Sequence, residues 1–288
     1  MKKFIHQHRS MLITIAFFAV VLTLILVMTR QRSIVVTNPQ LNVRTGPGIE
    51  YQRIATIRGK KRVTVVAKQN EWYRIRLTDH KFGWVASWLV NSHQVHKTAT
   101  NLAEATIVLD PGHGGSDSGA SYDNSKKRSR LEKTYTLALA KKVAADLRAH
   151  GARVIMTRDS DNYVGLAPRP QLAESAHADA FVSFHYDSSP SANQGTGVTT
   201  YYYHKGASKR LARSVNGEFN NLPLTNKGID FGNFEVIRDN TRPAILCEMG
   251  YINSTKDYHH IKSPTYQWLV THDVVKGLNQ FIAANRKK

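Results

Sequence analysis

The chain has 288 residues, enough for one or two domains with cores of their own, and its shares of hydrophobic (41%) and charged (21%) residues are ordinary for a globular protein. Its formal net charge of +19 is not ordinary, and basic residues exceed acidic ones in 1–32, 33–104 and 105–288 alike, which excludes a single basic arm as the source. Such a field attracts polyanions in general, and the single cysteine excludes an internal disulfide.

Residues 11–29 (MLITIAFFAVVLTLILVMT) form a run without a charge, and basic residues flank it. This length is sufficient for a helix that crosses a bilayer. A cleaved signal peptide has a shorter apolar region followed by a small-x-small site, which is missing here. We therefore expect 1–32 to comprise a cytoplasmic N-terminus and an uncleaved signal anchor, with 33–288 outside the membrane. A buried core helix is the alternative. The external location argues against nucleic acid as a partner.

Short strands and turns alternate through residues 33–90, with turn signals about ten residues apart, which predicts a small all-β barrel. Three stretches, LNVRTGPGIEY, NEWYRIRL and GWVASWLV, resemble a bacterial SH3-like domain. The resemblance implies binding to the cell wall. For each of Trp72, Trp84 and Trp88, a place in the small core is the simpler interpretation.

The polar segment 91–104 has no clear period and is interpreted as a linker. After it, apolar patterns of strand and helix type alternate, and we expect 105–288 to form one α/β domain. Its sheet is predicted to be mostly parallel and flanked by helices. The expected strands are 106–109, 152–157, 180–184, 198–203 and 244–247, and the expected helices are 133–150, 171–177, 207–220 and 266–284.

Three of these strands end in residues of the type that bind metals. Strand 106–109 leads into His113, strand 180–184 into His185 and strand 244–247 into Glu248. Glu132 lies at the start of the long helix. Ligands of open α/β sheets gather beyond the carboxyl ends of the strands. Two histidines and a carboxylate, with one position left for water, form a hydrolytic zinc set, and a further carboxylate would act as general base. Each residue taken alone also has an ordinary structural interpretation.

The loop that carries His113 reads VLDPGHGGSDSGA, and its glycines raise the question of a phosphate-binding loop. Neither G-x-x-x-x-G-K-[ST] nor G-x-G-x-x-G is present, and Asp110 at the entrance disfavours phosphate. The glycines then serve a turn or a metal-site corner.

The stretches IVLDPGHGGSDSGA, LEKTYTLALAKKVAADLRAHGARVIMTRDSD, ADAFVSFHYDSS, GVTTYYY and PAILCEMGYINS together resemble the zinc-dependent N-acetylmuramoyl-L-alanine amidases of the amidase-3 type. The resemblance implies that His113, Glu132 and His185 bind one Zn²⁺ and that Glu248 is the catalytic carboxylate. It also implies a reaction, hydrolysis of the amide between N-acetylmuramic acid and L-alanine of the stem peptide of peptidoglycan.

The chain departs from the family pattern at two places. Asp187 stands where the family usually has asparagine, and we expect it to contact the substrate. Prolines at 168 and 170 precede the helix expected at 171–177. In addition, the segment between Ser118 and Glu132 is too short for the long blocking helix of regulated relatives, which implies an open site.

Three other functions stay open at this point. Cys247 could be a nucleophile with a histidine base, but strand alternation places it on the face opposite Glu248, where a small buried hydrophobe is expected. The chain could also be a wall-binding protein with an inactive amidase domain, or a zinc peptidase or deacetylase. For the amidase, we expect a single-pass protein of the cell membrane whose C-terminal domains face the wall, with anionic wall polymers as further partners.

Overall fold

The structure, a computed structural model, describes residues 9–30, 33–77, 81–91, 101–124 and 127–286. The chain divides into two compact units, an N-terminal one within residues 1–95 and a C-terminal one that covers 96–288. The linker expected at 91–104 lies for the most part, at 92–100, outside the described residues. Residues 101–104 pack into the C-terminal unit, where Leu102 is fully buried and Asn101 donates from its backbone N–H to Asn279.

The run 11–29 is helical and lies within α2 (Arg9–Arg30). In the part of the chain that the structure describes, no helix is long and apolar enough to cross a membrane. The structure therefore gives no support to the membrane span expected at 11–29.

The N-terminal unit is rich in strands, as expected. It comprises β1 (Ser33–Val36), β2 (Gln40–Arg44), β3 (Arg53–Arg58), β4 (Lys61–Gln69), β5 (Trp72–Arg76), β6 (Phe82–Ala86) and the short helix α3 (Ser87–Val90). The strands form one antiparallel sheet in the order β1-β4-β5-β6-β2-β3. Of the three tryptophans expected in its core, Trp72 is buried and meets Trp88 edge to face at 5.8 Å, whereas Trp84 and Trp88 are half-buried.

The C-terminal unit alternates strands and helices. In chain order these are β7 (Thr106–Pro111), α4 (Glu132–Ala149), β8 (Arg153–Met156), α5 (Pro168–Ser175), β9 (Ala180–Asp187), β10 (Val198–Tyr202), α6 (Ala207–Asn216), β11 (Asn226–Phe231), α7 (Glu235–Arg238), β12 (Ala244–Tyr251), α8 (Thr255–Ile261) and α9 (Pro264–Asn285). Helix α5 begins at Pro168, three residues before the expected start, because proline is well accommodated in the first turn of a helix.

The sheet of this unit is mixed, and the expectation of a mostly parallel sheet is corrected to this extent. Its order is β11-β10-β12-β9-β7-β8. Strands β12, β9, β7 and β8 are mutually parallel, whereas β10, with β11 parallel to it, runs antiparallel to β12. The reason is the connection from β9 to β10. The segment 188–197 holds no helix, and a parallel return would need a crossover of a dozen residues or more.

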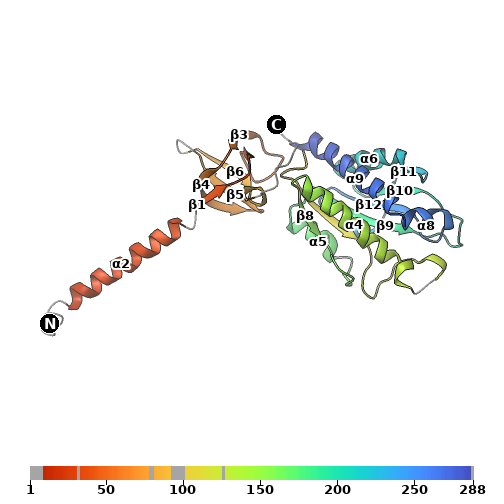
Figure 1. The fold of residues 1–288 in the computed structure, drawn as a ribbon, viewed down its shortest axis with the longest axis horizontal. Coiled ribbons are helices and arrows are strands. Elements are labelled where there is room, and N and C mark those ends of the chain that lie inside the picture. Colours follow the sequence, from red (N-terminus) through yellow and green to blue (C-terminus); the bar gives the residue numbers. More distant parts are fainter. Residues whose placement is uncertain (1–8, 31–32, 78–80, 92–100, 125–126, 287–288) are drawn as a thin grey trace. The chain divides into compact units, whose positions relative to one another are not determined.

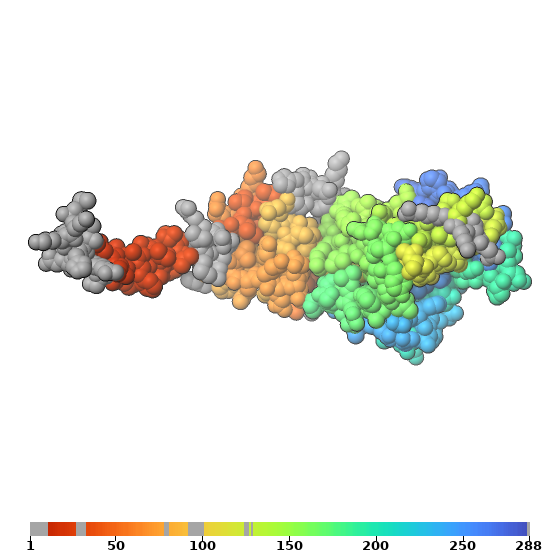
Figure 2. Space-filling model, turned by 90° about the horizontal axis from the view of Figure 1, so that it is seen from below, coloured from red at the N-terminus to blue at the C-terminus, as the bar shows by residue number. Residues whose placement is uncertain are grey.

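Helices cover both faces of the sheet (Figure 1). Helices α4, α9 and α6 pack side by side over one face, and α5 and α7 cover the other. On the second face, Val108, Phe181 and Leu246 form a buried apolar cluster with residues of α5 and α7. Segments from the beginning (yellow) and the end (blue) of this unit share its surface in Figure 2. Because β7, β9 and β12 are parallel neighbours, their carboxyl ends meet at one edge of this sheet.

Candidate active site

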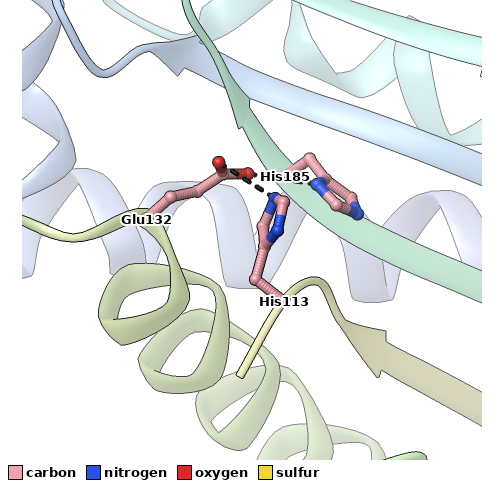
Figure 3. A group of neighbouring side chains, drawn as sticks. All are labelled: His113, Glu132 and His185. Atoms are coloured by element: carbon pink, nitrogen blue, oxygen red, sulfur yellow. Dashed lines mark hydrogen bonds and ion pairs between the residues drawn. The ribbon is translucent and has the colours of Figure 1, made fainter. Parts of the chain in front are cut away.

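Three side chains from different elements converge at the carboxyl edge of the sheet (Figure 3). His113 lies on the turn after β7, Glu132 is the first residue of α4, and His185 lies near the end of β9. The Glu132 carboxylate contacts both rings, with Oε2 at 3.0 Å from Nε2 of His113 and Oε1 at 3.0 Å from Nδ1 of His185. One ligand atom from each residue lies within 4.8 Å of the others. The sequence predicted this trio, and the structure brings it together.

Glu132 is 3% exposed and fully hydrogen-bonded. Besides the two rings, its carboxylate accepts from the backbone N–H groups of Ala120 (2.9 Å) and Tyr186 (3.0 Å). Burial alone would raise the pKa of Glu132, but the hydrogen bonds with His113 and His185 outweigh burial and hold that pKa well below its usual range. The carboxylate is therefore ionised, which is the form in which it can bind a cation.

His113 is oriented from behind by a carboxylate. Its Nδ1 lies 2.8 Å from Oδ2 of Asp117, whose Oδ1 accepts from the backbone N–H of Gly119 at 3.0 Å. Burial lowers the pKa of His113, but Glu132 and Asp117 together raise it above its ordinary value. Histidine ligands of metals usually make such a second contact to a carboxylate, which fixes the ring and its tautomer. Asp117 was not among the predicted site residues, although its spacing of four residues from His113 is visible in the sequence.

A glycine next to His113 is required by close packing. A Cβ atom at Gly112 would lie 2.2 Å from Cε1 of His185, so any larger residue would displace that ring. His113 itself and the following Gly114 have positive φ, at 61° and 130°. The glycines of this loop thus allow the turn of β7 to approach β9 closely, which places both histidines against one carboxylate.

Two buried arginines hold the backbone of this turn, and neither was among the predicted site residues. Arg169 of α5, 2% exposed, donates to Oδ1 of the fully buried Asp110 at 2.7 Å and to the carbonyl oxygens of Pro111 (3.1 Å) and His113 (3.2 Å). Arg158 donates to the carbonyl oxygens of Pro111 (3.0 Å) and Gly112 (2.9 Å). Asp110 therefore anchors the loop that carries His113. Its partner, Arg169, lies between the two prolines by which the chain departs from the family pattern.

Glu248 lies beside this trio on the neighbouring strand. In the register of β12 with β9 it pairs with His185, so both side chains face the same side of the sheet. Its Oε2 is buried and has no hydrogen-bond partner among the described residues. Burial, followed by the nearby charges of Glu132 and Asp187, raises the pKa of Glu248 well above its ordinary value.

Cys247 occupies the opposite face of β12. It is fully buried and contacts the hydroxyl of Thr200, with Oγ1 and Sγ 4.0 Å apart. Burial raises the pKa of this thiol to about 12. The geometry therefore places Cys247 away from the metal ligands and agrees with a buried small hydrophobe.

Asp187 lies one step further along β9 than His185 on the same face, and it pairs with Tyr251 of β12. Burial, with a hydrogen bond from the Tyr251 hydroxyl to Asp187, raises the pKa of Tyr251 to about 12. Asp187 is thus near the site without being one of the three converging ligands.

Comparisons with known proteins agree with this arrangement. The family model for N-acetylmuramoyl-L-alanine amidase matches residues 107–280, and that for the bacterial SH3 domain matches 39–91. A probable cell wall amidase LytH of Staphylococcus saprophyticus is 39% identical over 84% of this chain and 81% of its own length. Its counterpart in Staphylococcus aureus is 34% identical over 98% and 97%.

Solved structures are similar as well. An N-acetylmuramoyl-L-alanine amidase from Clostridium difficile 630 has a TM-score of 0.60 and 33% identity, and the match covers 62% of this chain and 97% of that one. The catalytic domain of CwlV, an amidase of Bacillus (Paenibacillus) polymyxa var. colistinus, has a TM-score of 0.58 and 36% identity over 62% and 98%.

Proposed function

The chain belongs to the N-acetylmuramoyl-L-alanine amidase family, as its motifs predicted, and we propose that it hydrolyses the amide between N-acetylmuramic acid and L-alanine of peptidoglycan with the help of one zinc ion. The observation that carries the proposal is the convergence of His113, Glu132 and His185 beside Glu248, at the edge where α/β sheets bind their ligands.

The donor set fits zinc. Two imidazoles and one carboxylate are a common catalytic zinc set, and the ionised, buried Glu132 supplies the negative charge. His113, Glu132 and His185 would hold the ion. When bound there, zinc supplies Lewis-acid chemistry that polarises the amide carbonyl and acidifies water.

Glu248 handles the protons of the reaction in this proposal. Its unpartnered, buried Oε2 is free to accept a proton from the attacking water and to deliver it to the nitrogen of the departing alanine. Burial favours the protonated form, which suits the second of these two steps. Asp187, with Tyr251, would contact the substrate next to it.

We also propose that the two domains act outside the cell, at the outer face of the membrane, because peptidoglycan lies there. The sequence feature behind this proposed attachment is the charge-free run 11–29, whose length and flanking basic residues predicted a signal anchor. The bacterial SH3-like domain supports binding to the peptides of the wall. The net charge of +19 supports binding to its anionic polymers. Recovery of the chain in the soluble fraction of lysed cells would contradict the attachment.

The assignment of Glu248 is tested by Glu248→Ala. We expect the variant to keep one zinc per chain, measured by elemental analysis, because the three ligands remain. Its rate of amide hydrolysis should fall about 100- to 10,000-fold, the usual loss on removal of a general acid–base group. Cys247→Ala, one residue earlier on the opposite face, is the matched control and should retain activity. Full activity of Glu248→Ala would overturn the assignment.

A further inference from the structure

An irregularity in β12 redirects a side chain toward the active site. Glu248 pairs with His185, but Tyr251 pairs with Asp187, so three steps along β12 match two steps along β9. Gly250, with φ at 118°, lies within this bulge. In a regular strand, residues 248 and 251 would face opposite sides of the sheet. The bulge returns Tyr251 to the face of Glu248, and such irregularities often aim side chains at active sites.

Tyr251 in turn contacts the ammonium group of a lysine. Lys227 of β11 donates from Nζ to the Tyr251 hydroxyl at 3.0 Å, and its ammonium lies 4.3 Å from the centre of the Tyr251 ring. Tyr251 pairs in turn with Asp187 of β9. Lys227 lies between the residues of β11 that pair with Val198 and Thr200 of β10.

This register places Lys227 at the same height of the sheet as Glu248. Thr199 of β10, the residue between those two partners, pairs with Glu248. Lys227 is therefore two strands away from Glu248 at the same height of the sheet, a separation of about 10 Å between backbones. The long side chain of Lys227 can extend over part of this separation, toward Glu248.

A buried aspartate fixes the position of this group. Asp257, fully buried, accepts hydrogen bonds from the backbone N–H groups of Tyr251 (3.0 Å) and Gly197 (2.9 Å) and from the hydroxyl of Thr196 (2.5 Å). A Cβ at Gly195 would lie 2.2 Å from Cδ1 of Tyr251, so this loop lies directly against the ring. Asp257 and the loop at Gly195 thus hold Tyr251, the residue that Lys227 contacts, in place.

The charge of Lys227 lacks an anionic partner. Its side chain is exposed, and among the described residues no carboxylate lies within 4.0 Å of its Nζ. An ammonium has three N–H donors, of which the Tyr251 hydroxyl takes one. Two donors therefore remain for an anion that approaches from solvent.

We propose that Lys227, held by Tyr251, is a specificity-determining residue that binds a carboxylate of the stem peptide. The inference rests on the proposed amidase function. An extended peptide advances about 3.3–3.6 Å per residue, so a carboxylate on the second amino acid lies about 7 Å from the scissile amide. A span of about 7 Å fits within the roughly 10 Å between the backbones of Glu248 and Lys227.

The test compares two soluble substrates. One is N-acetylmuramoyl-L-alanyl-D-glutamate, and the other is the same compound with both carboxylates converted to amides. We expect the full chain, loaded with zinc, to favour the carboxylate form about three- to fivefold in kcat/KM through KM, the scale of an exposed ion pair. Lys227→Met and Lys227→Gln should bring this ratio close to one, whereas Lys227→Arg should retain it.

Lys209→Met is the matched control, because Lys209 also lies over a tyrosine ring, that of Tyr202 at 5.1 Å, but on α6 at the other face. It should keep the preference. Equal rates on the two substrates in the unaltered chain, or a preference that survives in Lys227→Gln, would overturn the inference. Cleavage of neither substrate by the unaltered chain would contradict the proposed function itself, and the inference with it.

Discussion

At the residue scale, the placement of the loop that carries His113 depends on a buried ion pair. Asp110 accepts from Arg169, from the hydroxyl of Thr157 and from that of Ser183, with both hydroxyl contacts at 2.6 Å. Both charges are removed from water, so their hydration is replaced entirely by protein donors and acceptors. The same guanidinium also binds the carbonyl of His113. The pair therefore couples the stability of the domain to the position of His113.

Removal of one member of this pair should be costly. We expect Arg169→Met to lower the free energy of unfolding by about 3–5 kcal/mol, because the Asp110 carboxylate is left buried without its counter-charge. Urea denaturation of the zinc-free protein measures this loss. Arg238→Met is the control, since its ion pair with Asp239 is exposed, and it should change stability little. Equal stability of Arg169→Met and the unaltered chain would show that the pair is not needed to hold the loop.

At the scale of elements, the close approach of the turn after β7 to β9 requires Gly112. We expect Gly112→Ala to lower zinc affinity about 10- to 100-fold, because its Cβ would push the His185 ring out of position. Competition with a zinc-binding dye measures the affinity. Gly217→Ala is the control, because a Cβ at Gly217 meets nothing within 4 Å. Unchanged zinc affinity of Gly112→Ala would refute this packing requirement.

The positions of the helices and strands in the C-terminal unit were largely predictable from the sequence, whereas the directions of the strands were less so. Apolar periodicity located α4 and the strands that carry His185 and Glu248, because these segments bury regular faces. The reversed direction of β10 was missed, although no helical pattern separates 184 from 198. The contacts of Arg158 and Arg169 with residues 46 to 59 positions away could not be predicted, since pairing across the fold leaves no local pattern.

At the scale of the whole molecule, the three converging ligands and Glu248 belong to the C-terminal unit alone, and the N-terminal unit is a separate SH3-like body. Under the proposed function, catalysis belongs to the C-terminal unit and attachment to the wall belongs to the N-terminal unit. Basic residues exceed acidic ones in both parts, so attraction to an anionic polymer would involve the whole chain.

Attachment through this charge should depend on salt. We expect less of the full chain to sediment with purified wall at 1 M salt than at 0.1 M, because the Debye length falls from about 10 Å to about 3 Å. Wall stripped of its anionic polymers is the control and should show a weaker salt effect. Equal sedimentation at both salt concentrations would rule out anionic polymers as partners.

Mass spectrometry of purified wall digested by the protein, with and without a zinc chelator, identifies the bond that the protein cleaves. We expect release of peptides with a free N-terminal alanine, which leaves glycan with intact lactyl groups, and we expect the chelator to abolish this release. Cleavage at another bond of the peptide would indicate a peptidase on the same site. The absence of any cleavage with zinc present would contradict the account and favour a wall-binding protein.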